Sequence, residues 1–359
     1  MKLPVTSTIV FNIINCAATQ LPQLHELSDA GAGKGMMQLT PPRDSELMTQ
    51  GSDAAVYRYG SFNSGLLTNG GISPAVLTLG LMRLLHQHGY HIEFRSYNFG
   101  TQKPNDGCGD WLSHCQHFGG EKANVSELVE NQLVPDLQKQ ARQGHISILA
   151  ECGVGGTTFA TLWLRLLTGL KLSPAGSTKV ETKLTRKELL IAELEKEYRS
   201  QFWSFEPEKL LTNNRYHDPL QFALYRTFQS WPTCLPRPIV AGGMMMMAPL
   251  VASQINKISL PAYIATTRWV MADATISKLI PAILPPGYQV KLHRSSYAKS
   301  RHACLRVFEE GLVVEGCGLG GMMVLAEQLI GSQDKILEAL ENAVDLHIQA
   351  HTREQYEAV

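Results

Sequence analysis

The sequence predicts an α/β fold of three layers, in which a mostly parallel sheet has helices on both faces. From about residue 70, short segments with strand character alternate with longer segments of helical character. Glycine-rich turns at residues 153–156 and 242–243 join two of the strands directly to helices. Strand, short loop and helix in this repeated order is typical of Rossmann-like sheets, because a crossover helix returns the chain to the same end of the sheet.

Each element has its own local pattern. Short apolar or alternating runs predict strands at residues 90–97, 145–151, 238–241, 260–265 and 288–293. Helices are expected at residues 75–88, 126–142, 186–200, 218–230 and 244–255, with others that begin near residues 157, 270 and 301 or end near residue 330. Ser73 can cap the first helix, with Pro74 at its first position. In the charged helix 186–200 the expected apolar stripe is Leu189, Leu190, Leu194 and Tyr198.

The length allows one large domain with additions. The chain has 359 residues, of which 44% are hydrophobic and 18% are charged, and this supplies enough apolar side chains for a large core. We expect residues 66–330 to form the α/β domain. Residues 1–65 are weakly patterned and are expected to contribute to a small helical domain, with which a C-terminal helix in residues 331–359 packs.

Charge and cysteine content narrow the class of protein. Lysine plus arginine and aspartate plus glutamate both number 32, so no basic surface for nucleic acid or an anionic membrane is expected. The chain has no run of about 18 apolar residues, and its first residues do not form a secretory signal. Seven scattered cysteines fit reduced thiols better than a disulfide framework. These features predict a cytoplasmic protein that acts on small molecules.

Two familiar motifs fail on their spacing. Residues 31–35, Gly-Ala-Gly-Lys-Gly, lack the preceding strand, the wider glycine spacing and the Ser or Thr of a phosphate-binding loop, so a flexible loop is the better interpretation. Cys108, His114, Cys115 and His117 are the best candidate metal ligands. Their spacing matches no zinc motif, and the glycines around them indicate an irregular surface segment. No metal site is therefore expected.

The first candidate site follows the second predicted strand. Glu151 ends this strand, and glycines then lead to Thr157 and Thr158 at the start of a helix. The N–H groups of Gly155 and Gly156, the helix N-terminus and two hydroxyl groups could together bind a phosphate or a carboxylate. A strand-to-helix turn with threonine caps explains the same pattern, but a buried acidic side chain is costly unless it has partners or a role.

A second candidate site repeats this arrangement. Glu315 leads a glycine-rich turn, which contains Gly316 and Gly318, into an apolar helix. Glycines leave room for a flat ligand against the backbone, and the carboxylate could accept a proton there. The spacing is related to a dinucleotide-binding fingerprint, but no acidic residue follows at the distance that ribose binding needs. This absence disfavours a nicotinamide-dependent oxidoreductase.

Further polar residues follow other predicted strands. Lys299, Ser300 and His302 belong to a basic, hydroxyl-rich loop that could hold a phosphate, although a solvated loop explains it equally well. Thr266 and Thr267 form a smaller group of the same kind. The four methionines at 244–247 are interpreted as core filling on a buried helix.

Taken together, these segments resemble the nicotinate-nucleotide–dimethylbenzimidazole phosphoribosyltransferases, in particular the divergent branch of archaea and cyanobacteria. The resemblance runs from about residue 70 to residue 330. It is carried by the order of five segments: 151–158 (Glu-Cys-Gly-Val-Gly-Gly-Thr-Thr), 240–243 (Val-Ala-Gly-Gly), 263–269 (Tyr-Ile-Ala-Thr-Thr-Arg-Trp), 299–302 (Lys-Ser-Arg-His) and 315–321 (Glu-Gly-Cys-Gly-Leu-Gly-Gly).

The chain also departs from that family. The Pro-Pro-Gly-Ser-Leu-Gly segment near the N-terminus of the better-known enzymes is missing. Gly156 stands where many members have asparagine, and the methionine run replaces a more polar stretch. We therefore expect the pocket for the base to differ more than the phosphate side does.

The resemblance implies a reaction and its residues. A phosphoribosyl group would pass from nicotinate mononucleotide to 5,6-dimethylbenzimidazole or a related base, which gives an α-riboside phosphate and nicotinate, as in the synthesis of the lower ligand of cobamides. Glu315 would be the catalytic base and Glu151 would assist it. The glycines, threonines and basic loop named above, together with Gly242 and Gly243, would bind the substrates. The resemblance implies a homodimer, and the reaction needs neither a metal nor a cofactor.

Two questions stay open at this point. The acceptor could be dimethylbenzimidazole, adenine or a simpler benzimidazole. A second class of function is a nucleotide-binding or sensing protein of the same fold that does not carry out the transfer. Such a protein needs the glycines and the hydrogen-bond donors but no base, so the presence of Glu315 favours an enzyme.

Overall fold

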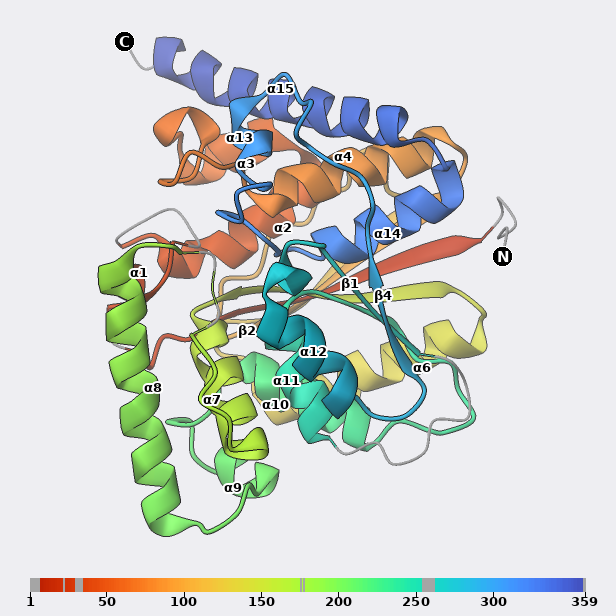
Figure 1. Ribbon diagram of the computed structural model, residues 1–359. Helices are drawn as coiled ribbons and strands as arrows, with labels where there is room; N and C mark the ends of the chain where they lie inside the picture. Colours follow the sequence, from red (N-terminus) through yellow and green to blue (C-terminus); the bar gives the residue numbers. More distant parts are fainter. Residues whose placement is uncertain are drawn as a thin grey trace.

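The predicted fold class is confirmed. The computed structural model describes residues 7–21, 23–29, 35–174, 176, 178–253 and 262–357, with side chains up to residue 353. Within these residues, seven parallel strands form one sheet, and helices cover both of its faces (Figure 1). The result is the expected three-layer arrangement.

The strands follow an order that places the first one in the interior of the sheet. They are β1 (Thr8–Ala17), β2 (His91–Phe99), β3 (His114–Gly120), β4 (Ile146–Val154), β5 (Ile239–Ala241), β6 (Ala262–Thr266) and β7 (Tyr288–Leu292). Their spatial order is β3-β2-β1-β4-β5-β6-β7. The order reverses between β1 and β4, and sheets of this kind bind ligands beyond the carboxyl ends of their strands near such a point.

One layer of helices lies on the upper face of the sheet in Figure 1, and it includes the C-terminal helix. Its members are α2 (Thr40–Gln50), α3 (Ser52–Tyr59), α4 (Pro74–Gln87), α13 (Ala303–Arg306), α14 (Leu319–Ile330) and α15 (Gln333–Glu357). Gly80 of α4 lets α15 approach closely, because a Cβ atom there would lie 2.9 Å from the carbonyl oxygen of Ala339. The close packing of α15 on α4 thus depends on the lack of a side chain at Gly80.

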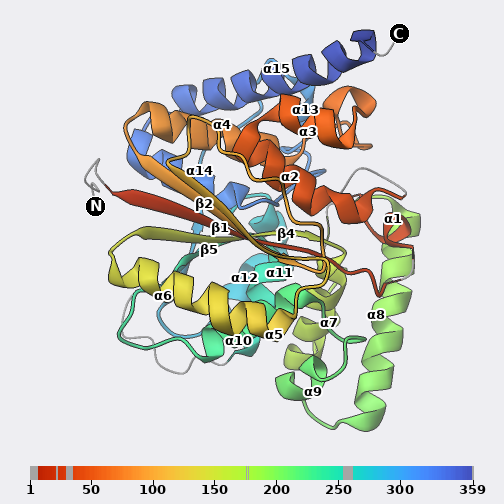
Figure 2. The ribbon, with the colours of Figure 1, turned by 180° about the vertical axis from the view of Figure 1, so that it is seen from behind.

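The second layer lies on the opposite face, as the reverse view in Figure 2 also shows. It comprises α5 (Val125–Leu128), the π-helical turn η3 (Val129–Leu133), α6 (Val134–Arg142), α7 (Gly156–Thr168), α8 (Glu181–Gln201), α9 (Pro207–Leu211), α10 (Pro219–Gln229), α11 (Met244–Ala252) and α12 (Ala274–Ile283). Three 3-10 turns, η1 (Met37–Leu39), η2 (Asn63–Gly65) and η4 (Val270–Ala272), and the short α1 (Leu24–Leu27) complete the described elements. Each layer packs its own apolar cluster against the sheet.

Two strands were not among the predicted elements. β1 lies in the weakly patterned N-terminal segment, because Asn12 and Asn15 interrupt its apolar run. Both amides donate hydrogen bonds inside the core: Asn12 exchanges hydrogen bonds of 2.9 Å with Gln140, and Asn15 donates to Asn98 at 2.8 Å. The polar residues thus lie in the sheet rather than in a loop. The predicted domain division at residue 65 stays a prediction.

The second missed strand, β3, corrects the expectation of an irregular surface segment around residues 108–117. β3 lies at the edge of the sheet and pairs with β2 from Glu93 opposite His114 to Phe99 opposite Gly120. Its side chains are mostly polar and its last two residues are glycines, which is a composition that strand patterns do not favour. Pairing with a long neighbour determines its conformation instead.

The apolar stripe predicted for α8 was partly wrong. Leu194 and Tyr198 are buried as expected, but Leu189 is 66% exposed. Lys187 takes a place in the buried stripe, with only 1% of its surface exposed. The helix also begins earlier than predicted, at Glu181. A lysine on the inner face of a helix is unusual and indicates a partner for its charge.

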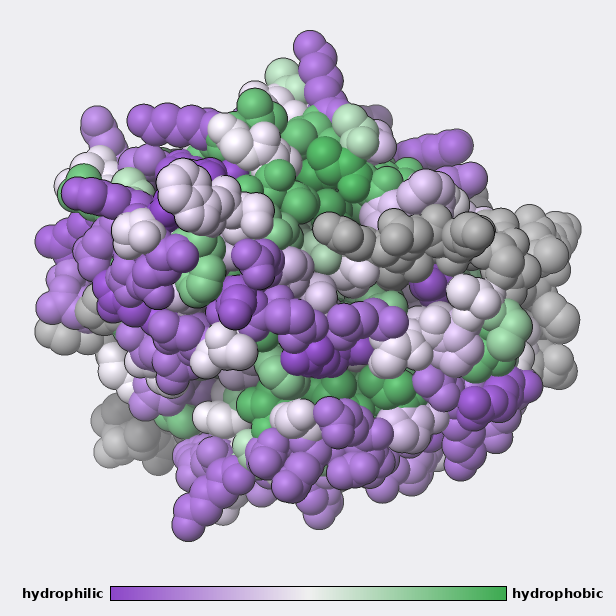
Figure 3. Space-filling view, turned by 90° about the horizontal axis from the view of Figure 1, so that it is seen from below, coloured by the Kyte–Doolittle hydropathy of each residue, from purple (hydrophilic) through white to green (hydrophobic). Residues whose placement is uncertain are grey.

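The surface is consistent with the balanced composition. Hydrophilic side chains cover much of the lower face of the molecule, with apolar areas between them (Figure 3). Among the described residues, no helix is both long enough and apolar enough to cross a membrane. The segment 31–35, for which we rejected a phosphate-loop motif, lies mostly outside the described residues.

Candidate functional site

A cavity of about 480 Å³ lies at the carboxyl ends of β4, β5 and β6. Residues from the segments that follow these strands line it, as do α2, the start of α7 and the loop between α7 and α8. Both glutamates that the sequence singled out, Glu151 and Glu315, face this cavity. The two glycine-rich turns therefore meet in one site, although only the turn after Glu151 follows a strand directly.

Glu315 is held in place by four hydrogen bonds. Its Oε1 accepts from the backbone N–H groups of Gly316 at 3.1 Å and Gly320 at 3.0 Å. Its Oε2 accepts from the hydroxyl group of Thr266 at 3.1 Å and from the backbone N–H of Thr267 at 2.8 Å. Burial raises the pKa of Glu315 above its ordinary value, although these hydrogen bonds favour the carboxylate and act against that increase.

Glycine at position 320 makes this arrangement possible. A Cβ atom there would lie 2.4 Å from the backbone of Thr266 and 2.5 Å from Glu315 Oε2. The first turn of α14 can thus approach the end of β6 closely enough for its N–H to reach the carboxylate. Gly318 serves the same turn with a φ of 67°, and a Cβ there would lie 2.7 Å from that of Ala150 in β4.

Glu151 is the less firmly bound of the two carboxyl groups. It is 5% exposed, and its Oε2 accepts a hydrogen bond of 2.9 Å from the backbone N–H of Gly153. Burial, together with repulsion from Glu315 and a smaller contribution from Asp218, raises the pKa of Glu151 to about 8. At neutral pH Glu151 is therefore mostly protonated, whereas the donors around Glu315 favour its carboxylate form.

Asp218 is a third buried carboxyl group in this region, although it does not line the cavity. It caps α10: its Oδ1 accepts from the backbone N–H of Gln221 at 3.0 Å, and the Gln221 side chain accepts in return from the backbone of Asp218. Burial raises the pKa of Asp218 to about 7. Its Oδ2 has no hydrogen-bond partner among the described residues, and a Cβ on Gly156 would lie 2.5 Å from it.

The start of α7 forms a group of potential anion donors. Gly155 and Thr157 line the cavity, and no side chain caps α7, which leaves N–H groups at its start for a ligand. The N–H of Thr158 already donates to the carbonyl oxygen of Gly155 at 3.1 Å. Lys187 Nζ donates to Thr157 Oγ1 at 2.5 Å, and burial lowers the pKa of this lysine to about 7. Lys171 and Lys179 also line the cavity. The arrangement suits a phosphate group.

Apolar side chains form other parts of the cavity wall. Trp269 and Val270 follow β6, and Met244 and Met245 open α11. Met246 and Met247, by contrast, are fully buried, as the core-filling interpretation predicted. The methionine run therefore has two roles, since its first half faces the cavity. Thioether and indole groups are well suited to contact a flat aromatic ring.

The structure divides the residues predicted for the site into three groups. Those that line the cavity are Glu151, Gly155, Thr157, Gly243, Glu315 and Gly316. Those that support the lining without reaching it are Gly156, Thr158, Gly242, Thr266, Thr267 and Gly318. Those that lie elsewhere are Lys299, Ser300 and His302.

The basic loop at 299–302 is attached to α15. Ser300 Oγ donates to Glu341 at 2.8 Å, and Arg301 donates to Glu341 and Asp345. His302 lies 3.1 Å from Asp345. The acidic face of the C-terminal helix thus neutralises this loop. Lys299, Ser300 and His302 therefore do not line the cavity and cannot bind a phosphate group there, contrary to what the sequence had suggested.

The candidate metal ligands at residues 108–117 do not come together. Cys108 Sγ donates to the carbonyl oxygen of Leu112 at 3.5 Å, and Cys115 Sγ lies 3.4 Å from His117 Nε2. No three donor atoms of this described segment lie close enough to hold one ion.

Several residues of the site were not among the predicted ones. Lys187 had a usable signal, because it lies in register with Ile191, Leu194 and Tyr198 on the buried stripe of α8. Trp269 ends the segment 263–269 that carries the resemblance, but it was not singled out, and Asp44 had no signal. All but one of the residues of α2 are buried, although most of them are polar, and nothing in its pattern indicates that it contributes to the cavity wall.

The chain is similar to UPF0284 proteins of cyanobacteria and archaea. It is 33% identical to one from Acaryochloris marina over 221 residues, which span 58% of this chain and 58% of that relative. It is 27% identical to one from Archaeoglobus fulgidus over 336 residues, or 90% of this chain and 89% of the relative. One from Synechocystis is 27% identical over 344 residues, or 89% and 86% of the two chains. No protein-family model matches the chain.

Proposed function

We propose that the protein transfers the phosphoribosyl group of nicotinate mononucleotide to 5,6-dimethylbenzimidazole or a related azole base. The observation that carries this proposal is the pairing of Glu151 and Glu315 in one cavity that also contains an uncapped helix N-terminus. The motif order that resembles the phosphoribosyltransferase family supports it. So does the similarity to proteins of cyanobacteria and archaea, which are the groups of the divergent branch.

The chemistry requires one proton acceptor and no acid. The bond between the anomeric carbon and the pyridinium nitrogen breaks, and its electron pair stays on the nitrogen of the departing nicotinate. One nitrogen of the azole attacks the anomeric carbon from the opposite face, which gives the α-riboside phosphate. The proton on the other azole nitrogen must leave, and a carboxylate in hydrogen-bond reach can accept it.

We assign the role of acceptor to Glu315. Four donors hold its carboxylate, and three of them are backbone N–H groups in fixed positions. The fourth is the hydroxyl of Thr266, which can rotate away and free a lone pair of Oε2 for the azole proton. Glu151, with its single backbone hydrogen bond, would order the substrates beside it.

The other parts of the cavity fit the remaining substrate groups. The N–H groups that open α7, with Thr157 supported by Lys187, would bind the phosphate of the mononucleotide. Trp269, Met244 and Met245 would contact the planar rings. A cavity of about 480 Å³ is of the size that small-molecule sites usually have. Positioning two planar substrates there supplies a large part of the rate enhancement.

A product assay tests this function. Purified protein is incubated with nicotinate mononucleotide and, in separate reactions, with dimethylbenzimidazole, benzimidazole or adenine, and chromatography follows free nicotinate and the α-riboside phosphate. We expect nicotinate release that depends on the base. Release without added base, or no release with any base, would contradict the transfer reaction. Thermal stabilisation by the mononucleotide without release would instead favour a nucleotide-binding protein.

Glu315→Gln tests the assigned base. The amide is isosteric, so the variant should fold normally, but it cannot accept the proton, and the rate should fall on the order of 100-fold or more. Glu310→Gln is the matched control, because Glu310 is exposed and does not line the cavity. Full activity of Glu315→Gln would remove Glu315 from this role and would leave Glu151 as the next candidate.

A further inference from the structure

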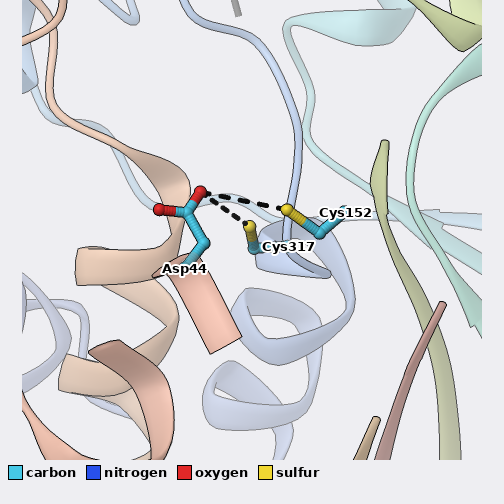
Figure 4. Close-up of side chains that lie close together, drawn as sticks. All are labelled: Asp44, Cys152 and Cys317. Atoms are coloured by element: carbon cyan, nitrogen blue, oxygen red, sulfur yellow. Dashed lines mark hydrogen bonds between the residues drawn. The ribbon is translucent and has the colours of Figure 1, made fainter. Parts of the chain in front are cut away.

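Three side chains with metal-binding donor atoms meet at the wall of the cavity (Figure 4). Asp44 lies on α2, Cys152 on β4, and Cys317 in the loop before α14. Asp44 Oδ2 lies 3.9 Å from Cys152 Sγ and 3.6 Å from Cys317 Sγ. The three donor atoms all lie within 4.8 Å of one another. Each side chain is more than nine-tenths buried, yet each lines the cavity.

We propose that Asp44, Cys152 and Cys317 bind a zinc ion in a tetrahedral site whose fourth position faces the cavity. Zinc–sulfur bonds of roughly 2.3 Å and zinc–oxygen bonds of roughly 2.0 Å place the sulfur and oxygen atoms of a tetrahedral site roughly 3.5 Å apart. The observed separations of 3.6 and 3.9 Å therefore need only a small contraction around the ion. Two thiolates and a carboxylate are a donor set that zinc accepts.

The carboxylate of Asp44 has unsatisfied capacity in this position. Its Oδ2 accepts a hydrogen bond of 3.1 Å from Ser73 Oγ, and the two thiols are weak donors to the same atom. Its Oδ1 is buried and has no hydrogen-bond partner among the described residues. Oδ1 points away from the two sulfur atoms, so the ion would bind Oδ2, and its positive charge would offset the cost of burying the carboxylate (Figure 4).

Cys317 has a strained backbone conformation, and this conformation directs its thiol into the cluster. Cys317 has a φ of 50°, in the left-handed region that a residue with a Cβ atom occupies at a cost of about 1 kcal/mol. Its N–H donates to the carbonyl oxygen of Glu151 at 2.9 Å, and its carbonyl oxygen accepts from Thr78 Oγ1 at 3.0 Å. Glycine would relieve the strain, as at positions 316 and 318 on either side, but it would remove the sulfur atom.

The charges around the cluster also fit a divalent cation. Two thiolates and one carboxylate carry three negative charges, which a buried site does not tolerate without compensation. Arg43 lines the same cavity beside Asp44, and it is 3% exposed. A zinc ion and the guanidinium group together neutralise the three ligands.

With three protein ligands, the proposed zinc site keeps one coordination position free. Three protein ligands with a free fourth position are typical of sites where zinc binds water or a ligand atom, whereas structural sites use four protein ligands. The free position would face the cavity beside Glu151 and Glu315, where it could take a water molecule or a nitrogen or oxygen donor of a bound ligand. This proposal does not depend on the phosphoribosyl transfer, because any small molecule in the cavity would meet the ion.

Metal analysis of the full chain tests the site without an activity assay. The protein is purified under reducing conditions, incubated with zinc chloride, freed of excess metal and analysed for zinc and protein content. We expect about one zinc ion per chain, since the described residues contain one such cluster. Cys152→Ser, Cys317→Ser and Asp44→Asn should each weaken binding by more than the roughly 10- to 100-fold that follows the loss of an outer-shell partner. Cys304→Ser, at a buried cysteine outside the cavity, should keep the ion.

Cobalt substitution of the unaltered protein provides a second readout that does not require a variant to fold. Cobalt bound by two thiolates gives an intense charge-transfer band in the near ultraviolet, and Cys304→Ser should give the same band. Reduced protein that binds neither zinc nor cobalt would overturn the proposal. An unchanged zinc content in Cys152→Ser and Cys317→Ser would also overturn it. So would a disulfide between Cys152 and Cys317 in the protein as isolated, because the two thiols would then not be free to bind the ion.

Discussion

Glu309 connects the loop that carries Trp269 to the segment after β7. Its Oε2 accepts hydrogen bonds from Arg268 and from Trp269 Nε1, the latter at 3.1 Å, and its Oε1 accepts from Ser296 Oγ at 2.9 Å and the N–H of Tyr297 at 2.6 Å. Burial alone would raise the pKa of Glu309, but these hydrogen bonds outweigh it and lower the pKa to about 2. The ionised form is therefore part of the folded structure.

We expect Glu309→Gln to lower the free energy of unfolding by about 2 kcal/mol at pH 7, since the amide can replace only some of the acceptor interactions. The pKa in the folded state lies below the ordinary value of 4.5, so the carboxylate stabilises the protein above pH 4.5 and loses this effect as the pH falls towards 2. Urea denaturation at pH 7 and pH 3 measures both free energies. The difference between the two proteins should shrink at the lower pH, and a difference that stays constant or grows would contradict this account.

Glu151 and Glu315 show how the surrounding residues change the properties of a carboxyl group. Glu151 and Glu315 both precede a glycine-rich turn that leads into a helix, so the local sequence around them is similar. The structure distinguishes them, because Glu315 accepts four hydrogen bonds and Glu151 accepts one from Gly153. A difference in role between the two carboxyl groups thus follows from their environment and not from residue type.

At the scale of elements, α15 is attached through two buried histidines. His347 Nδ1 lies 2.9 Å from Ser52 Oγ of α3, and its Nε2 lies 3.2 Å from the carbonyl oxygen of Gly65. The rings of His347 and His351 are 4.6 Å apart. Burial, with a smaller effect of the charge on Arg43, lowers the pKa of His351 to about 4, and burial also lowers that of His347. Both rings are therefore neutral in the folded protein at pH 7.

Mild acid should loosen this attachment. The unfolded chain takes up protons at these histidines below the ordinary pKa of 6.5. In the folded chain the pKa of His351 is about 4 and that of His347 is also lowered, so stability is lost as the pH falls below 6.5. Between pH 7 and pH 5 the loss should be about 2 kcal/mol for His351. Urea denaturation at the two pH values measures it, and His351→Asn should show a smaller loss than the unaltered protein. The exposed His86→Asn is the control, and an equal loss in His351→Asn would refute the role of His351.

At the scale of the whole molecule, the cavity joins the two helical layers across the sheet. α2 of the upper layer and α7 of the lower layer both contribute to its wall, as do the segments after three strands. A ligand that contacts all of them binds the folded state alone. At a concentration of about 100 times its dissociation constant it should add about 2.7 kcal/mol to the free energy of unfolding.

This coupling gives a prediction for the proposed substrate. Nicotinate mononucleotide should raise the melting temperature by a few degrees, and nicotinate riboside at the same concentration should raise it less, because the riboside lacks the phosphate that the start of α7 would bind. Thermal unfolding followed by fluorescence measures both shifts. Equal shifts for the two compounds would show that α7 does not recognise the phosphate.

The sequence alone determined the α/β class and the position of Glu151. Alternating strand and helix patterns imply a parallel sheet, whose ligands bind beyond the carboxyl ends of its strands, so Glu151 at the end of a predicted strand was expected there. These inferences succeed because strand direction, turn chemistry and apolar periodicity are properties of neighbouring residues. The same local reasoning failed for β1 and β3, where hydrogen bonds from distant residues compensate for a polar composition. Glu315 follows no strand, and only its packing against Thr266 and Thr267 at the end of β6 brings it to the same edge.

Only the tertiary structure decided which side chains complete the site. Asp44 is 108 residues from Cys152 and 273 residues from Cys317, and their meeting depends on the strand order and on the packing of α2 over the sheet. The same packing attached the basic loop at 299–302 to α15, away from the cavity. Contacts between residues so far apart in the sequence leave no local pattern, because the residues are selected by the space that they share and not by their neighbours in the chain.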